Sequence, residues 1–264
     1  MLSSGQIKYV SALRVKKYRE KSGQFIAEGE KLVGDLISGS FSIAAVYGSP
    51  SWIQANGPLL IKKGIPFFKT LPQEMERIST LSTPSPVLAV VEIPEPPSFT
   101  PESGSLHPEG CIYLALDNIR DPGNLGTILR IADWFGITTV FCSEQSVELY
   151  NPKVIQATMG SIARVRVIYC DLVKVLSGLS LKIPVFGAFL EGDNLFKQDI
   201  PSEAVILIGN ESHGISPELE PYITRKLVIP SFGPTKTGKA ESLNASVATA
   251  IICAEFRRAS YQQQ

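Results

Sequence analysis

The stretch LDNIRDPGNLGTILR, residues 116–130, decides the fold expected for most of this chain. An apolar run at residues 111–116 leads into it and predicts a buried strand. A turn rich in Asp, Pro and Gly follows, and Asn124 is placed to cap a helix. The apolar side chains expected on the buried face of that helix are Ile128, Ile131, Ala132 and Phe135. Arg130 lies off this stripe, so the stretch is either a plain crossover with a solvated Arg or part of an α/β active site.

Strand and helix patterns alternate through the C-terminal part of the chain, residues 110–264. Further strands are expected at residues 139–142, 165–168, 184–188, 204–208 and 226–229. Helices are expected at residues 151–159, 171–179, 217–222 and 241–258. Such alternation predicts an α/β domain with a parallel sheet that is covered on both faces. No G-x-G-x-x-G follows a strand, so the dinucleotide-binding fingerprint is absent.

A smaller α/β sandwich domain is expected over residues 1–93. Its strands are predicted at residues 25–29, 43–47, 66–68 and 87–91, and its helices at residues 6–21, 30–38, 50–64 and 72–78. A linker rich in Pro, Ser and Gly, without an apolar period, follows at residues 94–109. The chain is therefore expected to hold two domains.

The helix expected at residues 6–21 concentrates positive charge. Residues 1–100 carry 11 Lys and Arg against 8 Asp and Glu, and most of this surplus lies in that helix. Arg14, Lys17 and Lys21 form a basic face with Tyr18 beside them. The face is either a solvated surface or a contact for the phosphates and an unstacked base of a nucleic acid.

Composition limits the remaining possibilities. The chain has 264 residues, 44% of them hydrophobic and 19% charged, which is ordinary for a globular protein. No apolar run approaches the roughly 18 residues of a membrane span, and the N-terminus lacks the apolar region of a secretory signal. Four widely spaced Cys residues and two His residues predict reduced thiols in a cytoplasmic protein and no metal site.

Two further stretches change the interpretation of the first. One is ILIGNESHGISPEL at residues 206–219. The other is LVIP at residues 227–230, followed after a Gly-containing loop by ESLNASVATAI at residues 241–251. Together with residues 116–130, these stretches resemble the signature motifs of the SpoU/TrmH family of ribose 2′-O-methyltransferases, which belongs to the SPOUT superfamily. The resemblance covers residues 111–258.

The resemblance implies an enzyme that transfers a methyl group from S-adenosylmethionine to a ribose 2′-hydroxyl of rRNA or tRNA. It also implies that residues 203–250 form a deep trefoil knot, that the N-terminal domain binds the RNA substrate, and that the chain is a homodimer through its C-terminal domain. The small-sided apolar helix at residues 241–258 favours such a partner, unless the helix of the first motif covers it completely. No metal and no membrane are implied.

Four residues match the catalytic positions of the family motifs: Arg130, Asn124, Glu211 and Asn244. Arg130 is a difficult general base because a guanidinium side chain stays protonated at physiological pH. A bidentate grip on a neighbouring phosphate is the easier role, although both stay open. Asn124 and Asn244 are equally suited to helix capping, and Glu211 to a solvated loop.

The donor is expected at the C-terminal ends of the strands, where open α/β sheets bind ligands. The residues expected to contact it are Ala188, Phe189, Gly192, Gly209, Asn210, Ile229, Pro230, Ser242 and Leu243. Residues 231–240 form a longer loop than in many relatives, so its donor contacts stay open, and Lys236 and Lys239 are candidates to face RNA. The rival functions are a non-catalytic RNA-binding protein on the same scaffold and a base-methylating member of the superfamily.

Overall fold

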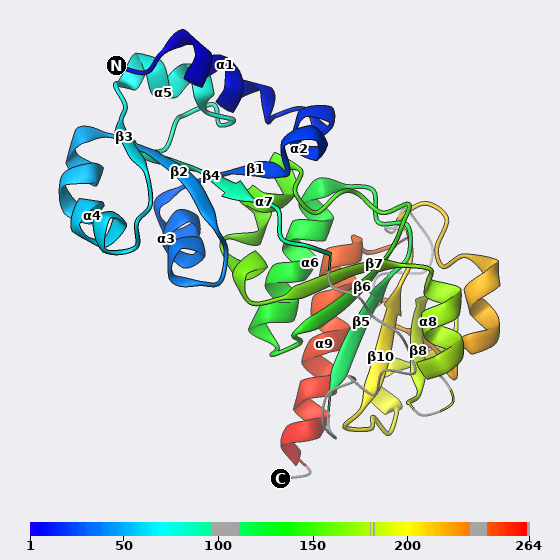
Figure 1. The fold of residues 1–264 in the computed structure, drawn as a ribbon. Coiled ribbons are helices and arrows are strands. Elements are labelled where there is room, and N and C mark those ends of the chain that lie inside the picture. Colours follow the sequence, from blue (N-terminus) through cyan, green and yellow to red (C-terminus); the bar gives the residue numbers. More distant parts are fainter. Residues whose placement is uncertain (97–110, 180, 182, 233–241, 263–264) are drawn as a thin grey trace. The chain divides into compact units, whose positions relative to one another are not determined.

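The computed structural model describes residues 1–96, 111–179, 181, 183–232 and 242–262, and it divides into two compact units (Figure 1). Unit 1 comprises Met1–Glu95 and Glu148–Arg164. Unit 2 comprises Pro96–Val147 and Val165–Gln264. The segment Glu148–Arg164 thus packs with the N-terminal unit, although it lies within the C-terminal part of the sequence.

Unit 1 is built on a four-stranded sheet in the order β1-β4-β2-β3. The strands are β1 (Gln24–Glu28), β2 (Ile43–Gly48), β3 (Phe67–Lys69) and β4 (Val87–Glu92). β4 runs antiparallel to both β1 and β2, and β3 runs parallel to β2. Residues 87–91 are all buried, because β4 lies inside the sheet and helices cover it.

The described helices of unit 1 are α1 (Ser4–Ala12), α2 (Lys16–Ser22), α3 (Glu30–Ser38), α4 (Pro50–Lys62), α5 (Pro72–Ile78), α7 (Pro152–Thr158) and the short 3₁₀ helix η2 (Ser161–Ala163). The single helix expected at residues 6–21 is wrong, because the chain breaks between α1 and α2. Val15 is extended there, with φ −100° and ψ 129°. The buried Arg19 donates from Nη1 to the carbonyl oxygens of Leu13 and Arg14, both at 2.9 Å, which satisfies the open end of α1.

Three contacts tie Glu148–Arg164 to the rest of unit 1. Arg19 binds both carboxylate oxygens of Glu148, at 3.0 and 2.7 Å. The ring of Tyr150 lies 4.8 Å from that of Phe25, between centroids. Arg164 pairs with Asp35 at 3.2 Å. These long-range contacts explain why a segment from the middle of the chain belongs to the N-terminal unit.

Unit 2 holds a seven-stranded sheet in the order β7-β6-β5-β10-β8-β11-β9. The strands are β5 (Ile112–Leu116), β6 (Thr139–Ser143), β7 (Arg166–Cys170), β8 (Val185–Phe189), β9 (Asp193–Asn194), β10 (Ala204–Ile208) and β11 (Arg225–Val228). Every pair of neighbouring strands is parallel, which confirms the expected sheet. All the strands therefore end at the same edge.

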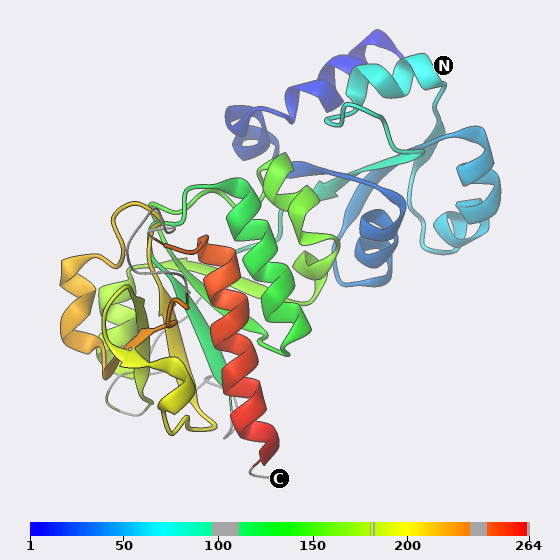
Figure 2. The same ribbon diagram turned by 180° about the vertical axis from the view of Figure 1, so that it is seen from behind.

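Helices cover both faces of this sheet (Figures 1 and 2). On one face α8 (Leu172–Leu179) and the 3₁₀ helix η4 (Pro217–Tyr222) pack on Tyr113, Ala115 and their neighbours. On the other, α6 (Pro122–Trp134) and α9 (Ala245–Gln262) lie side by side, and Phe256 meets Phe186 edge to face at 5.2 Å. Alternate strand residues thus face opposite layers, as expected of a sheet buried on both sides.

Small differences from the expected elements lie near turns. Residues 217–222 form a 3₁₀ helix rather than an α-helix, and Pro221 lies inside it. The strand β9 and the 3₁₀ helix η3 (Leu195–Lys197) carry no apolar period long enough to predict. Across the described ranges, no helix combines the length and the apolar composition needed to cross a membrane.

Candidate active site

The first motif begins its helix with a different cap from the one expected. Asp121 is the N-cap of α6, its Oδ1 accepts from the backbone N–H of Asn124 at 2.8 Å, and Pro122 is the first helical residue. The expectation that Asn124 caps the helix is therefore wrong. Asp directly before Pro is the stronger start signal, because it supplies the capping oxygen while Pro occupies a position that needs no N–H. The side-chain amide of Asn124 is left for other contacts.

The register of α6 places Arg130 on the surface. The buried apolar stripe is Leu125, Ile128, Leu129 and Ala132. The expected stripe is right at Ile128 and Ala132 and wrong at Ile131 and Phe135, which are partly exposed. Arg130 is exposed, and Trp134, one turn later, is 84% exposed. Within the described ranges, Arg130 makes no hydrogen bond or ion pair, so its guanidinium is available to a ligand.

Glu211, Asn124 and Asn244 form one chain of hydrogen bonds in unit 2. Asn124 Nδ2 donates to Glu211 Oε1, and Asn244 Nδ2 donates to Asn124 Oδ1 at 2.8 Å. These pairs join positions 87 and 120 residues apart in sequence. The three motifs therefore meet at one place, and each amide is oriented by its neighbour.

Asn244 also starts the last helix. Its Oδ1 accepts from the N–H of Ser246 at 2.9 Å and from Ser246 Oγ at 2.6 Å, and its carbonyl accepts from the N–H of Ala248 at 2.9 Å. This is the geometry of an N-cap. Asn244 thus both caps α9 and holds Asn124, so the two roles left open by the sequence are combined.

A second set of contacts joins the loops that follow β5 and β10. Asn210 Nδ2 donates to the carbonyl of Asn118 at 2.8 Å, and Asp117 Oδ2 accepts from the N–H of Ser216 at 2.8 Å. Asn118 has a positive φ of 56°, and Ser143 Oγ holds its N–H at 2.8 Å. Sequence reasoning missed Asp117, Asn118 and Ser143. The sequence feature that could have identified them is a polar side chain at the end of a predicted strand, because the ends of adjacent parallel strands lie together.

The residues expected to bind the donor gather at three neighbouring strand ends. Ala188 and Phe189 end β8, and Ile229 and Pro230 follow β11, which pairs with β8 in the register Leu227↔Ala188 and Val228↔Phe189. Gly209 and Asn210 follow β10 on the other side of β8. All six residues are partly buried. They offer backbone groups beside apolar side chains, which fits an adenosyl group.

Two of the glycines are required by the protein's own backbone. A Cβ on Gly209 would lie 2.3 Å from the carbonyl carbon of Gly214. Gly192 has φ +151°, and a Cβ there would lie 2.4 Å from the carbonyl oxygen of Lys226. These close approaches explain the two glycines without a ligand.

Ser242 and Leu243 are exposed just before α9, and Leu243 is 47% exposed. Residues 233–241 lie outside the described residues, so Lys236 and Lys239 do too. On the donor side, Lys226 Nζ lies 4.5 Å from the ring centroid of Phe189. The same ammonium group pairs with Glu220 Oε2 at 2.6 Å, so its charge beside the strand ends is balanced by a carboxylate.

Three thiols of unit 2, those of Cys142, Cys170 and Cys253, are poor candidates for chemistry. Burial raises the pKa of Cys170 and of Cys253 to about 12, and the charges of Asp171 and Glu144 add to the effect at Cys170. Burial also raises the pKa of Cys142 far above its ordinary value. These thiols therefore stay protonated near neutral pH and are weak nucleophiles. In the part of the chain that the structure describes, no group of His, Cys, Asp and Glu side chains is arranged to hold a metal ion.

The basic residues of unit 1 separate into two kinds. Arg14 Nη2 donates to the carbonyl oxygens of Arg77, at 2.8 Å, and Ser79, so its guanidinium also braces the domain. Lys17 and Lys21 are exposed and, among the described residues, have no acidic partner. Lys16, by contrast, pairs with Glu20 at 3.6 Å. Lys17 and Lys21 are therefore the freer cations.

Comparisons with known proteins agree with this geometry. The model of the SpoU rRNA Methylase family matches residues 111–254, and that of an MRM3-like substrate binding domain matches residues 5–89. The 23S rRNA (guanosine(2553)-2′-O)-methyltransferase RlmP of Bacillus subtilis is 26% identical over 96% of both chains.

Two solved structures resemble the whole chain. A putative RNA methyltransferase of the TrmH family from Porphyromonas gingivalis is 38% identical, with a TM-score of 0.82 over 98% of this chain and 99% of that one. An rRNA methyltransferase from Sinorhizobium meliloti with bound AdoMet is 27% identical, with a TM-score of 0.82 over 98% of this chain and 96% of that one. With its three motifs joined in one network and a family model that spans residues 111–254, the chain belongs to the SpoU rRNA Methylase family.

Proposed function

We propose that one set of residues in this chain binds the methyl donor and that another set binds the RNA acceptor. The chain is an S-adenosylmethionine-dependent RNA methyltransferase that modifies a ribose 2′-hydroxyl of ribosomal RNA. The observation that carries the assignment is the network of hydrogen bonds that joins Asn124, Glu211 and Asn244, together with an exposed Arg130 on the same helix as Asn124. In this scheme residues 110–264 carry the reaction and residues 1–93 bind the RNA, in the cytoplasm.

The donor side of the site lies at the ends of β8, β10 and β11. Bound S-adenosylmethionine supplies an electrophilic methyl group there. Ala188, Phe189, Ile229 and Pro230 provide the partly buried surface for it, and Gly209 lets the chain after β10 turn close to these residues. Gly192, Asn210, Ser242 and Leu243 complete the proposed donor set. Asn210 contributes by holding the loop, since its amide is already bound to the Asn118 carbonyl.

The acceptor side centres on Arg130. Its guanidinium is exposed and unpaired among the described residues, so it can grip a phosphate of the RNA with two parallel hydrogen bonds. Positive charge beside the ribose favours loss of the 2′-hydroxyl proton and fixes the line of attack. Hydrogen bonds among Glu211, Asn124 and Asn244 keep the start of α6, the loop after β10 and the start of α9 in one arrangement. The phosphate grip is preferred to a general-base role because a guanidinium stays protonated at physiological pH.

The proposal also includes the chain topology and the oligomeric state. The expected topology is a deep trefoil knot within residues 203–250, which family membership supports. The expected oligomer is a homodimer through α6 and α9. α9 buries Ile252, Cys253 and Phe256 within unit 2, whereas Val247 of α9 is 46% exposed and Trp134 of α6 is 84% exposed. A partner subunit would cover exposed apolar side chains of α6 and α9 such as these, in a two-fold interface.

The test is ribose methylation of defined RNA. RNA from a strain that lacks this protein should lose methylation at one nucleotide, and purified protein should restore it with S-adenosylmethionine. Nucleoside analysis should place the new methyl group on ribose. A methyl group on the base would instead identify a base-methylating enzyme. RNA binding without any donor binding would identify a non-catalytic RNA-binding protein.

A further inference from the structure

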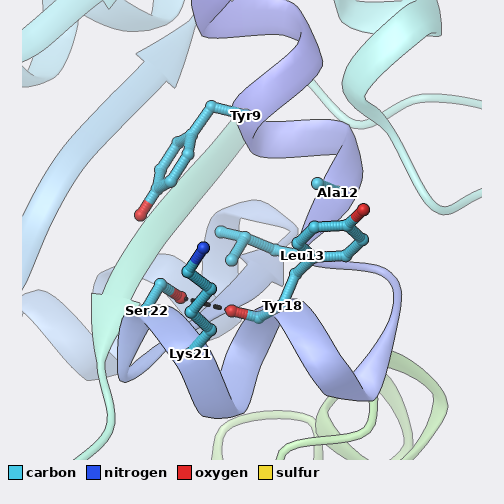
Figure 3. Close-up of a pocket in the computed structure, with 6 residues that line it drawn as sticks. All are labelled: Tyr9, Ala12, Leu13, Tyr18, Lys21 and Ser22. Atoms are coloured by element: carbon cyan, nitrogen blue, oxygen red, sulfur yellow. Dashed lines mark hydrogen bonds between the residues drawn. The ribbon is translucent and has the colours of Figure 1, made fainter.

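A small pocket in unit 1 lies where the helix expected at residues 6–21 breaks into α1 and α2 (Figure 3). Its volume is about 280 Å³. The residues that line it are Tyr9, Ala12, Leu13, Tyr18, Lys21 and Ser22. Small-molecule sites usually measure about 300–1,000 Å³, so this pocket suits a single flat group rather than a whole cofactor or a peptide helix.

Two aromatic rings stand on the walls of this pocket. Tyr9 is 44% exposed and Tyr18 is 49% exposed, and in Figure 3 the rings lie on opposite sides of Leu13. Leu13 is only 1% exposed and forms an apolar floor. Exposed aromatic faces above an apolar floor are suited to stacking, which any nucleobase accepts through its π face.

Tyr9 is held in place before any ligand arrives. Its hydroxyl donates to Gln24 Oε1, and Gln24 Nε2 donates to Glu92 Oε1 at 2.6 Å. This chain of hydrogen bonds anchors the ring to β1 and β4. Tyr18 differs, because its hydroxyl has no partner within the described ranges and its ring can adjust to a ligand. Because the Tyr9 ring is already fixed, less conformational entropy is lost when a base stacks between the two rings.

The pocket also contains a positive charge. The side chain of Lys21 reaches into the space beside Tyr9 and Leu13 (Figure 3), and among the described residues its ammonium group has no acidic partner. Lys17, four residues earlier on α2, is exposed as well. A cation next to stacking surfaces matches the two parts of a nucleotide, its phosphate and its base. An apolar peptide would leave this ammonium group unpaired.

We propose that this pocket binds one unpaired nucleobase of the RNA substrate, stacked on Tyr18 and Tyr9, with Lys21 on the adjoining phosphate. The inference rests on the proposed function, since it takes RNA as the substrate. It adds a requirement on that RNA, namely a bulged or looped-out nucleotide recognised by unit 1. A fully paired helix cannot present such a base, because its π faces are covered by neighbouring pairs.

The test compares two RNA probes on the full chain. One is a fully paired RNA duplex, and the other is the same duplex with a single bulged 2-aminopurine nucleotide. The wild-type chain should bind the bulged probe more tightly, by roughly 5- to 150-fold for one stacked base. The fluorescence of 2-aminopurine should change on binding, because the base leaves water and stacks on a ring.

Matched variants separate stacking from charge. Tyr18→Phe keeps the ring and should keep the preference for the bulged probe, whereas Tyr18→Leu should lose it at an unchanged melting temperature. Lys21→Gln should weaken binding of both probes alike, because phosphates are common to both. A preference that persists in Tyr18→Leu would overturn the proposal and assign the pocket to another occupant, such as a protein.

Methyl transfer to ribosomal RNA distinguishes this failure from failure of the proposed function. If the chain methylates ribosomal RNA but binds both probes equally, only the pocket proposal is wrong. If it binds neither probe and transfers no methyl group, the proposed function is wrong as well.

Discussion

At the scale of single residues, Arg130 differs from the other three motif residues of the candidate site. Glu211, Asn124 and Asn244 are bound to one another, whereas the guanidinium of Arg130 is exposed and unpaired among the described residues. A charged side chain without a structural partner contributes little to stability, so its substitution reports on function. This separation makes Arg130 the clearest residue at which to test the acceptor side.

Arg130→Ala should abolish most methyl transfer while leaving donor affinity within about twofold. Loss of one charge-assisted contact to developing charge lowers kcat by roughly 10²- to 10³-fold. Single-turnover transfer and calorimetric titration with S-adenosylmethionine measure the two effects. Arg130→Lys is the control, because it retains the charge without the bidentate fork. Loss of donor affinity together with activity would contradict the division into donor and acceptor sides.

Asn244 allows capping and network roles to be separated. Asn244→Asp keeps the oxygen that caps α9 but loses the Nδ2 donor to Asn124. Its stability should stay within about 1 kcal/mol of wild type, since a negative charge is favourable at a helix start, while methyl transfer should fall. Asn244→Ala loses both roles and should be less stable by a further 1 kcal/mol or so. Urea denaturation measures the stability of both variants, and initial rates measure their methyl transfer. Full activity in Asn244→Asp would show that the network is only structural.

At the scale of elements, the break between α1 and α2 depends on one buried cation. Arg19 is 2% exposed and its guanidinium binds two carbonyl oxygens and the Glu148 carboxylate. A continuous helix through residues 13–15 would have used these carbonyls internally. The break lets α2 turn away and creates the pocket beside Tyr18 and Lys21.

Arg19→Ala should lower the free energy of unfolding by about 3–5 kcal/mol, because it leaves the Glu148 carboxylate and the carbonyls of Leu13 and Arg14 without this partner. Urea denaturation of the full chain measures the change. Lys16→Ala provides the matched control. It removes an ion pair with Glu20 whose side chains are 64% and 63% exposed, so its cost should be no more than about 1 kcal/mol. Equal costs for the two variants would rule out the structural role of Arg19.

At the scale of the whole molecule, RNA affinity should depend on salt through the free lysines of unit 1. Lys17→Glu should raise KM for RNA more than it lowers kcat, and the affinity of the wild-type chain should fall steeply with salt. Steady-state kinetics at several salt concentrations measure both. Lys62→Glu, an equal charge reversal at an exposed position of α4, should leave KM nearly unchanged. Binding insensitive to salt would exclude a phosphate contact.

The proposed homodimer predicts a shared site. An Arg130→Ala subunit and an Ile229→Arg subunit should each be inactive alone, whereas a mixture allowed to exchange subunits should regain activity. The physical reason is that an intact Arg130 on one subunit can serve the intact donor side of the other. Sedimentation should show a dimer, and melting temperatures check that both variants fold. A monomer, or no recovery after proven exchange, would refute the shared site.

The sequence by itself indicated most of the elements and the candidate residues of the site. Apolar runs of strand length predicted the parallel sheet, because strands buried on both faces are apolar throughout. Start signals placed most helices within a few residues, and the motifs identified Arg130, Asn124, Glu211 and Asn244. These inferences depend on local patterns or on motif order, both of which can be read along the chain.

Only the tertiary structure decided how these pieces combine. Asn124 changed from an expected cap to the centre of a network because Asp121 caps α6 and because Glu211 and Asn244 arrive from distant positions. The segment Glu148–Arg164 belongs to the N-terminal unit, where Glu148 binds the buried Arg19. The helix expected at residues 6–21 is interrupted where Arg19 also binds the Leu13 carbonyl. Hydrogen bonds between residues more than 80 positions apart leave no periodic trace in the sequence, so such pairings become visible only when the chain has folded.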